Sequence, residues 1–479
     1  MRISFILKIF VFSSVLGVCL LMLILANKPG FNKSHSSDYD YSLYREILIV
    51  APHNDDEILG SGGVIQKHLS NGANVRVLMM TNGDGQYRGP FVTNKKNEIK
   101  LGYRRQKETL EALKSLGISE ANVIFLGYPD HGLHDLWDNY WDCGTLYRSK
   151  KTGEDHTEHS DSFNVDAPYC GMSVVSDLMK IIGTRVPDVI YMPHPFDIHP
   201  DHWATNAFVV YSIEKLKAEY PENEKLNNIR EITYLVHFWH WPLPRGKRLK
   251  DSLTPPKQLS GLDTEWVDIE LQPSETDKKL NAIRMYKSQI EYMPKYLETF
   301  ARRNELFGIL HPLSLNMSPK FENYMSDPNL LTGNESETSN EPAPFLSYFD
   351  PRHKSIYADI RRFNDIKSLE IIKFSQKLKI TVSCYQKINS ANDLLIHIKS
   401  IDKTPDNRSY RFLLDGKSLS LNNEDISKDN RFAYILESNS FTIEIPLEIL
   451  HNPEKIILGA EFLRKDYSFS KSAYRVIEL

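Results

Sequence analysis

The sequence predicts an α/β fold with a Rossmann-like, mostly parallel sheet and helices on both faces, followed by an all-β, β-sandwich-like domain. Between residues 46 and 237, short apolar runs alternate with longer amphipathic stretches, which is typical of a parallel sheet with crossover helices. After residue 344, short runs of alternating polarity are separated by turn signals such as Asp415-Gly416 and Asn452-Pro453, as in a sandwich.

The expected elements follow the chain in order. In the α/β domain, strands are expected at 46–51, 75–80, 123–126, 188–192 and 232–237, and helices at 57–70, 103–116, 173–184 and 203–218, with a helical region over 275–310 closing it. Glycines in the first helix, such as Gly60, are expected to let that helix approach the sheet closely. In the sandwich, strands are expected at 378–384, 394–398, 410–414, 432–436, 441–445, 456–462 and 474–477.

The composition of the 479-residue chain is that of a globular protein with more than one domain, with 41% hydrophobic and 25% charged residues. A stretch rich in Asn, Ser, Glu, Pro and Thr reads as a linker between the two domains. The sequence divides into an N-terminal segment 1–27, a juxtamembrane linker 28–45, the α/β domain 46–318, a linker 319–344 and the β-sandwich-like accessory domain 345–479.

The N-terminal segment is apolar over residues 9–26 and is preceded by Arg2 and Lys8. A helix over this run would be about 27 Å long, close to the hydrocarbon thickness of a bilayer. The positive flank favours a cytoplasmic N-terminus. The segment is therefore expected to be a transmembrane signal anchor or a cleaved signal peptide, and either one places the remaining chain outside the cytoplasm. A buried core helix is the third alternative.

Charge and cysteine content exclude other classes. Lys and Arg number 58 against 62 Asp and Glu, which gives a net charge of −4 and argues against a nucleic-acid partner. The four cysteines form no CxxC pair and are too few for a disulfide scaffold. Cys143 and Cys170 can pair in an oxidising compartment, and two free thiols stay the alternative.

Two loops rich in His and Asp carry the chemistry. The first, Pro52-His53-Asn54-Asp55-Asp56-Glu57, follows the strand at 46–51, and the second, residues 193–202, follows the strand at 188–192. Because ligands bind beyond the carboxyl ends of parallel strands, both loops are expected to meet at one site. Imidazole and carboxylate ligands suit Zn²⁺ and leave a position for water. Two adjacent Asp residues allow one to bind metal and the other to accept a proton.

These loops make the chain resemble the PIG-L/LmbE-like family of zinc-dependent N-deacetylases, which act on N-acetylglucosamine-containing molecules. The first loop resembles the family's first motif, with Asn54 where Pro is usual, and His199-Pro-Asp-His202 resembles its second. The resemblance covers about residues 46–310, and further similar segments lie at 81–85, 105–108, 127–130, 279–282 and 286–289.

The resemblance implies a role for each residue of the two motifs. His53, Asp56 and His202 would hold one Zn²⁺ per chain, with another divalent metal as the alternative. Asp55 would be the general base, and protonated His199 would stabilise the oxyanion of the tetrahedral intermediate. Asp201 would orient a histidine from outside the ligand set. The residues alone do not distinguish His199 from His202 as the ligand.

Three further residues are expected to contact substrate, each with a structural alternative. Asp130 follows a strand and can also form a turn, Arg105 can form a structural ion pair, and His237 can pack in the core. No oligomeric state is predicted.

The expected function is a membrane-tethered N-deacetylase for N-acetylglucosamine-type sugars in a surface polysaccharide, a wall glycan or a lipid-linked saccharide. Two alternatives stay open. One is a glycolipid de-N-acetylase of the N-acetylglucosaminyl-phosphatidylinositol type with a cytosolic catalytic domain. The other is a tethered glycan-binding protein whose deacetylase domain is inactive.

Overall fold

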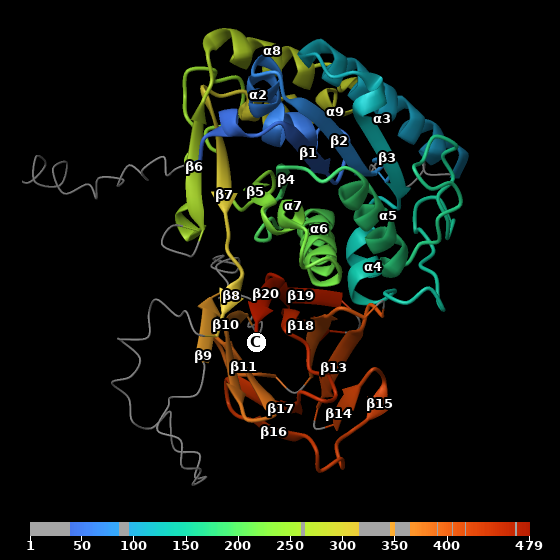
Figure 1. The fold of residues 1–479 in the computed structure, drawn as a ribbon, viewed down its shortest axis with the longest axis vertical. Coiled ribbons are helices and arrows are strands. Elements are labelled where there is room, and N and C mark those ends of the chain that lie inside the picture. Colours follow the sequence, from blue (N-terminus) through green and yellow to red (C-terminus); the bar gives the residue numbers. More distant parts are fainter. Residues whose placement is uncertain are drawn as a thin grey trace, which may run out of the picture.

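The computed structural model describes residues 39–85, 95–259, 264–315, 345–349, 365–389, 391–404, 406–416, 418–464 and 467–479. Figure 1 shows an α/β part and, packed against it, a β-rich part that contains the C-terminus. The apolar segment 9–26 and the linker 319–344 lie outside the described residues, and the domain boundaries stay predictions. Within the described ranges, no helix has the length and apolar character needed to cross a membrane.

Seven strands of the described chain form the sheet of the α/β part, in the order β3-β2-β1-β4-β5-β7-β6. The first five pair in parallel, as predicted, whereas β7 is antiparallel to both β5 and β6. The strands are β1 (Glu46–Ala51), β2 (Asn74–Thr81), β3 (Val123–Tyr128), β4 (Val189–Pro193), β5 (Arg230–Tyr234), β6 (Glu265–Glu270) and β7 (Asn304–Ile309).

Helices cover both faces of this sheet. Alternate residues of β1 belong to two different cores, with Ile47 and Ile49 facing one side and Leu48 and Val50 facing the other. Helices α2, α3 and α8 supply the first core, and α4, α5 and α6 supply the second. The helices are α2 (Asp56–Ser70), α3 (Lys95–Leu116), α4 (Leu133–Asp138), α5 (Gly171–Thr184), α6 (Pro200–Glu219), α7 (Glu224–Asn227), α8 (Pro273–Ile283), α9 (Lys287–Ile290) and α10 (Pro294–Leu297), with 3₁₀ turns at Tyr41–Leu43, Glu120–Asn122, Lys257–Leu259 and Glu298–Phe300.

The strand order changes direction between β1 and β4. The chain runs outward from β1 through β2 to β3, and then returns to place β4 on the other side of β1. A switch of this kind opens a crevice at the carboxyl ends of the two central strands. The two His/Asp loops follow these two strands, so the topology brings them together.

Helix α2 lies close against the sheet, as its glycines predict. A Cβ atom at Gly60 would collide with the ring of Tyr234 on β5. The N–H of Gly63 donates to Oε1 of Glu305 at 2.6 Å, which ties α2 to β7. The close approach fixes the N-terminus of α2, where the first His/Asp loop ends.

The region 275–310, which the sequence predicts to be helical, is only partly so. Only α8, α9 and α10 are α-helical, and the region ends in strand β7; β6 was also not predicted. β7 is fully buried although it begins with Asn304 and Glu305. Glu305 tolerates burial because it accepts hydrogen bonds from Gly63, Val64 and Lys279, all distant in sequence.

The β-rich part contains two sheets around one apolar core. All seven predicted strands are present to within a few residues. The strands of this part are β8 (Leu313–Ser314), β9 (Phe345–Phe349), β10 (Ile366–Phe374), β11 (Lys377–Cys384), β12 (Asp393–Ile401), β13 (Ser409–Asp415), β14 (Ser418–Leu421), β15 (Glu424–Asp425), β16 (Ala433–Leu436), β17 (Ser440–Pro446), β18 (Lys455–Arg464), β19 (Tyr467–Lys471) and β20 (Arg475–Glu478). β8 pairs with β20, so the chain joins this part directly after β7.

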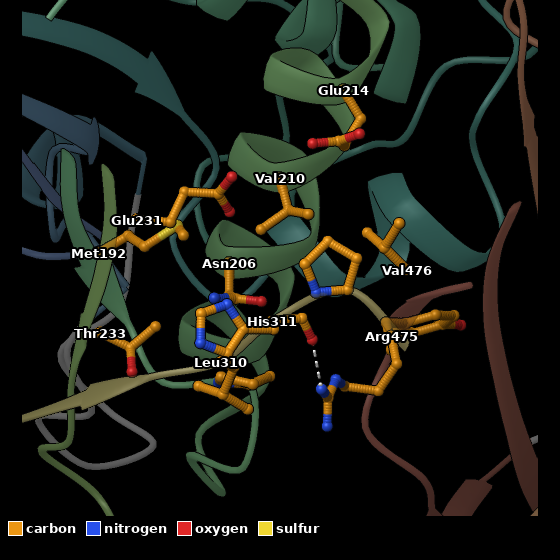
Figure 2. A pocket seen from close by; sticks show the side chains of 13 residues that line it. Met192, Asn206, Val210, Glu214, Glu231, Thr233, Leu310, His311, Arg475 and Val476 are labelled. Carbon is orange, nitrogen blue, oxygen red and sulfur yellow. Dashed lines mark hydrogen bonds between the residues drawn. The ribbon is translucent and has the colours of Figure 1, made fainter. Parts of the chain in front are cut away.

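Charged and aromatic contacts join the two parts. Nζ of Lys471 lies 2.7 Å from Oδ2 of Asp138, and the hydroxyl of Tyr474 donates to Oδ1 of the same carboxylate at 2.5 Å. A small cavity of about 50 Å³ lies at this boundary. Figure 2 shows side chains that line it, among them Arg475, which donates to the carbonyl oxygen of His311 at 3.0 Å. These contacts fix the β-rich part beside α4 and α6.

A disulfide joins Cys143 to Cys170, the residue before α5. The pairing is one of the two alternatives left open by the sequence. It closes a polar insertion between α4 and α5, and Cys384 is a buried free thiol in the β-rich part.

Candidate metal centre

The first loop places three polar side chains beyond the end of β1. His53 lies in the loop, and Asp56 begins α2. Between them, Asp55 has φ 127°, a conformation that a residue with a Cβ rarely adopts. Backbone strain of this kind is typical of functional sites and costs roughly 1–3 kcal/mol.

The second loop places His199 and His202 beyond the end of β4. His199 caps α6, and its Nδ1 accepts a hydrogen bond from the N–H of Asp201 at 3.2 Å. His202 follows in the first turn of α6 and is fully buried.

The three predicted ligands converge. Oδ2 of Asp56 lies 3.1 Å from Nδ1 of His53 and 3.0 Å from Nε2 of His202. Two ligand atoms of a tetrahedral zinc site, with bonds of about 2.0–2.1 Å, lie about 3.3 Å apart. The two separations measured here, 3.1 and 3.0 Å, are close to this distance between ligand atoms.

Near this point, the ligand atoms of three other combinations of described side chains all lie within 4.8 Å of one another, whereas the predicted trio shares Asp56 as its common contact. Each set shares a residue with the predicted ligands, and the sets are His53–His199–His202, Asp56–His202–His237 and His53–Asp130–Asp201. In the predicted trio, both histidines contact Asp56 at about 3 Å, and each has another carboxylate on its second ring nitrogen.

Those carboxylates set the direction of each imidazole. Oδ2 of Asp201 lies 3.1 Å from Nε2 of His53, which leaves Nδ1 toward Asp56. Oδ2 of Asp197 lies 3.2 Å from Nδ1 of His202, which leaves Nε2 toward Asp56. Histidine ligands commonly have a carboxylate on the second ring nitrogen, which fixes the ring and makes it a better ligand.

The residues present fit a divalent cation. Nε2 of His202, the ring nitrogen on the side of Asp56, is buried and makes no hydrogen bond of normal geometry with a described residue. Five carboxylates crowd this small volume with exposures of 0 to 7%, namely Asp55, Asp56, Asp130, Asp197 and Asp201. Buried carboxylates need compensating charge, and a dication among them supplies it.

The carboxylates also control the protonation of the histidines. Burial lowers the pKa of His202, but Asp197 and Asp56 outweigh this effect and raise it to about 9. Burial likewise opposes protonation of His53, and Asp130 leads the carboxylates that hold its pKa well above the usual value. Metal binding at these two residues must therefore displace protons.

Asp55 lies beside the three converging side chains without joining them. Burial, and then the negative charge of Asp56, raise the pKa of Asp55 well above its ordinary value. Its N–H donates to Oε2 of Glu57 at 3.0 Å, and the hydroxyl of Tyr286 donates to Oε1 of that same carboxylate. A carboxylate with a raised pKa, held at a fixed position, is suited to accept and return a proton.

His199 lies at the same site in a different electrostatic state. Its ring centre is 4.8 Å from that of His53 and 5.1 Å from that of His202. Burial, and then the neighbouring histidines, hold the pKa of His199 well below its usual value, which counts against the protonated form. Because Nδ1 accepts a hydrogen bond, the neutral ring carries its proton on Nε2.

The three predicted substrate contacts occupy different positions. Asp130 is buried, and its Oδ1 lies 3.2 Å from Nε2 of His53. Its Oδ2 accepts a hydrogen bond from the N–H of Gly85. Arg105 is also buried, and it donates to the carbonyl oxygens of Gly83 and Asn54. Nη2 of Arg105 also lies 3.7 Å from Oδ1 of Asp55, an ion pair of the kind that the structural alternative expects. Substrate contact by Asp130 or Arg105 stays a prediction.

His237 lies at the site. The sequence predicted that it ends a strand, and this is wrong. β5 ends at Tyr234, because the N–H groups of Val236 and His237 donate to Oδ2 of Asp197 at 3.1 and 2.9 Å instead of to a neighbouring strand. The ring centre of His237 is 4.7 Å from that of His202, and Nδ1 lies 3.0 Å from the hydroxyl of Tyr296.

Sequence reasoning missed Asp197 and Glu57. Asp197 lies in the second loop, five residues before His202. A carboxylate in the same loop as two histidines could have indicated that it contacts one of them. Glu57 directly follows Asp56, but its partner Tyr286 is far along the chain, so nothing local predicts their contact.

The comparisons with known proteins cover the part of the chain that contains this site. The model of the GlcNAc-PI de-N-acetylase (PIG-L) family matches residues 48–213. A Mycobacterium (strain KMS) 1D-myo-inositol 2-acetamido-2-deoxy-alpha-D-glucopyranoside deacetylase is 27% identical over 38% of this chain, which spans 54% of that relative's length. The deacetylase of the same name from Rhodococcus opacus is 25% identical to this chain. The match covers 55% of this chain and 87% of the length of that relative.

Among solved structures, N,N'-diacetylchitobiose deacetylase from Pyrococcus horikoshii is similar, with 20% identity and a TM-score of 0.38. The match covers 62% of this chain and 97% of that one. The family match includes His53, Asp55, Asp56, His199 and His202, the residues that the fold brings together. Residues 48–213 of this chain are a domain of the GlcNAc-PI de-N-acetylase (PIG-L) family.

Proposed function

We propose that this protein is a zinc-dependent N-deacetylase that hydrolyses the acetamide of N-acetylglucosamine-type sugars. The observation that carries the proposal is the convergence of His53 and His202 on Asp56, with Asp55 beside them. The similarity to deacetylases of N-acetylated sugars supports the same substrate class.

His53, Asp56 and His202 would hold the zinc ion, and Asp201 and Asp197 would fix the two histidines. Bound there, zinc would supply a Lewis acid and lower the pKa of water at the site. The five surrounding carboxylates make a cation favourable, and the buried position excludes competing solvent.

Asp55 would take a proton from the attacking water as the water oxygen adds to the amide carbon. The same carboxyl group would then give that proton to the sugar nitrogen as the carbon–nitrogen bond breaks, which releases acetate and the amine. The raised pKa of Asp55 favours proton uptake.

His199 would donate its Nε2 proton toward the amide oxygen as negative charge develops there. A neutral donor in a buried site stabilises this charge without the cost of burying a second cation. This interpretation differs from the protonated form that the family resemblance implies. It is supported by the hydrogen bond that the backbone N–H of Asp201 donates to Nδ1 of His199.

The test compares metal content and acetate release in wild type, His202→Ala and His156→Ala. His156 is a half-exposed histidine of the insertion, so its variant is the matched control. We expect about one zinc per chain and acetate release in wild type and control, and neither in His202→Ala. A folded wild-type protein that binds no divalent metal would overturn the proposal and leave the inactive glycan-binding alternative.

We further propose that the catalytic part works outside the cytoplasm, tethered by the apolar segment at 9–26. The positive flank of that segment and the Cys143–Cys170 disulfide support this location, because disulfides persist in oxidising compartments. Peptide mapping of protein isolated under thiol-blocking conditions tests it. Free thiols at both cysteines would favour the cytosolic glycolipid de-N-acetylase instead.

A further inference from the structure

A groove of about 820 Å³ lies between the α/β part and the β-rich part, and we name it the interface groove. This volume is within the range of sites that hold small organic ligands. One wall comes from α4, the start of α6 and the loop after β5, and the other from β13, β18 and β19. Among its lining residues are His134, Trp203, Trp239, Arg411, Glu461 and Lys471.

The interface groove adjoins the metal centre. Ile198 and Pro200 line it, and they flank His199 in the chain. Nδ1 of His134, another lining residue, lies 3.6 Å from Oδ1 of Asp201. A substrate that places its acetamide at the metal centre can therefore extend into the groove.

The charged groups of the groove are largely compensated. Nζ of Lys471 lies 2.7 Å from Asp138 and 2.9 Å from Glu461, and Lys150 lies 3.7 Å from Asp135. A polyanion would need an excess of cations, and lipid tails would need an apolar wall. Paired side chains of this kind offer fixed donors and acceptors to neutral hydroxyl groups.

Two residues on opposite walls are well placed to bind sugar rings. Trp239 is 48% exposed, so its ring offers an apolar face to the apolar face of a sugar. On the β-rich wall, Nε of Arg411 is buried and has no hydrogen-bond partner among the described residues. An unpaired buried donor of this kind favours a ligand that supplies an acceptor.

We infer that the interface groove binds the sugar residues next to the one being deacetylated, so that the substrate is an oligosaccharide or polysaccharide and not a single sugar. The β-rich part then contributes directly to substrate binding. The inference rests on the proposed deacetylase function, because the metal centre defines which sugar reacts.

The test measures acetate release and binding for N-acetylglucosamine and its β-1,4-linked dimer and pentamer with the full chain. We expect kcat/KM to rise with length in wild type. Trp239→Ala and Arg411→Gln, one from each wall, should each lower the pentamer-to-monomer ratio of kcat/KM about tenfold, or about 1.4 kcal/mol. Tyr220→Ala is the control, because Tyr220 is an exposed aromatic residue beyond the far end of α6.

The outcomes separate the two proposals. One result is acetate release that does not depend on substrate length, and another is release that both variants reduce equally for every length. Either result overturns the inference that the groove binds neighbouring sugars and leaves the proposed deacetylase function intact. Pentamer binding that Trp239→Ala weakens, without acetate release from any probe, overturns the deacetylase and supports the groove. Absence of both binding and release overturns both.

Discussion

Oδ2 of Asp197 lies 3.2 Å from Nδ1 of His202, and both side chains are completely buried. The same oxygen accepts the N–H groups of Val236 and His237. Asp197 therefore connects the candidate metal ligand on α6 to the loop after β5 and fixes the ring that points at Asp56.

Asp197→Asn tests this relationship. The amide keeps the size of the side chain but removes the charge that makes His202 a strong ligand. We expect zinc affinity to fall 10–100-fold, the usual cost of losing such a partner, measured by competition with a chelator of known affinity. Asp277→Asn is the control, because Asp277 is an exposed residue of α8. An unchanged affinity would show that His202 does not depend on Asp197.

Tyr286→Phe tests how Asp55 is held. The hydroxyl of Tyr286 donates to Glu57, whose other oxygen accepts the N–H of Asp55 at 3.0 Å. Burial raises the pKa of Glu57 to about 7, so the tyrosine is an important partner for its charged form. We expect unfolding free energy to fall by about 1–3 kcal/mol and kcat to fall about tenfold, with zinc content unchanged.

Tyr292→Phe provides the comparison for that experiment, because Tyr292 is 60% exposed on the neighbouring segment. Loss of zinc together with kcat in Tyr286→Phe would instead mean that the tyrosine supports the ligands and not the proton acceptor.

The double variant Cys143→Ser/Cys170→Ser tests the disulfide. The bond closes a loop with a sequence separation of 27, which restricts the unfolded chain. Loop-closure entropy predicts a loss of about 3–4 kcal/mol in unfolding free energy, measured by urea denaturation. Reductant should destabilise wild type by a similar amount and leave the double variant unaffected. Equal stability of all forms would mean that the bond is not formed in the protein.

The central site was predictable because its signals are local. A buried parallel strand followed directly by His53 or by His199 and His202 indicates the edge of the sheet where ligands bind, and the strand order confirms this placement. The alternation of β1, β2, β3, β4 and β5 with helices is equally local, because each strand or helix shows its own periodicity.

The remaining features depend on contacts between distant residues. β7 was missed because a glutamate at position 305 is typical of a surface residue. Its burial depends on hydrogen bonds from Lys279 and from Gly63 on α2, which are distant in the sequence. His237 is not part of the predicted strand, because its N–H donates to Asp197 and not to a neighbouring strand. The interface groove requires β13, β18 and β19 to lie beside α4, which no single segment indicates.

A double-mutant cycle between Asp138 and Lys471 tests the contact that positions the β-rich part. Lys471 is buried between Asp138 and Glu461, so Lys471→Met leaves two buried carboxylates without their cation. We expect the single variant to lose about 3–5 kcal/mol of unfolding free energy. Asp138→Asn should recover part of that loss, with a coupling energy above about 1 kcal/mol. Strictly additive losses would show that the two residues act independently.

His68 on α2 predicts a specific dependence of stability on pH. Its Nε2 lies 2.8 Å from the hydroxyl of Tyr191, and burial lowers its pKa to about 4. In the unfolded chain the pKa returns to about 6.5, so below that pH the unfolded state binds a proton that the folded state does not. Stability that is present above about pH 6.5 is therefore lost as the pH falls toward 4, by up to about 3 kcal/mol.

Urea denaturation of wild type and His68→Gln between pH 8 and pH 4.5 measures this effect. Other buried groups also titrate, so the informative quantity is the difference between the two proteins. We expect His68→Gln to be less stable than wild type at pH 8 and to lose less stability on acidification, so that the two curves converge. His156→Gln, which changes a more exposed ring, should follow wild type. Parallel curves for wild type and His68→Gln would contradict the neutral, buried state of His68, because only a group whose pKa differs between the folded and unfolded chains changes the slope.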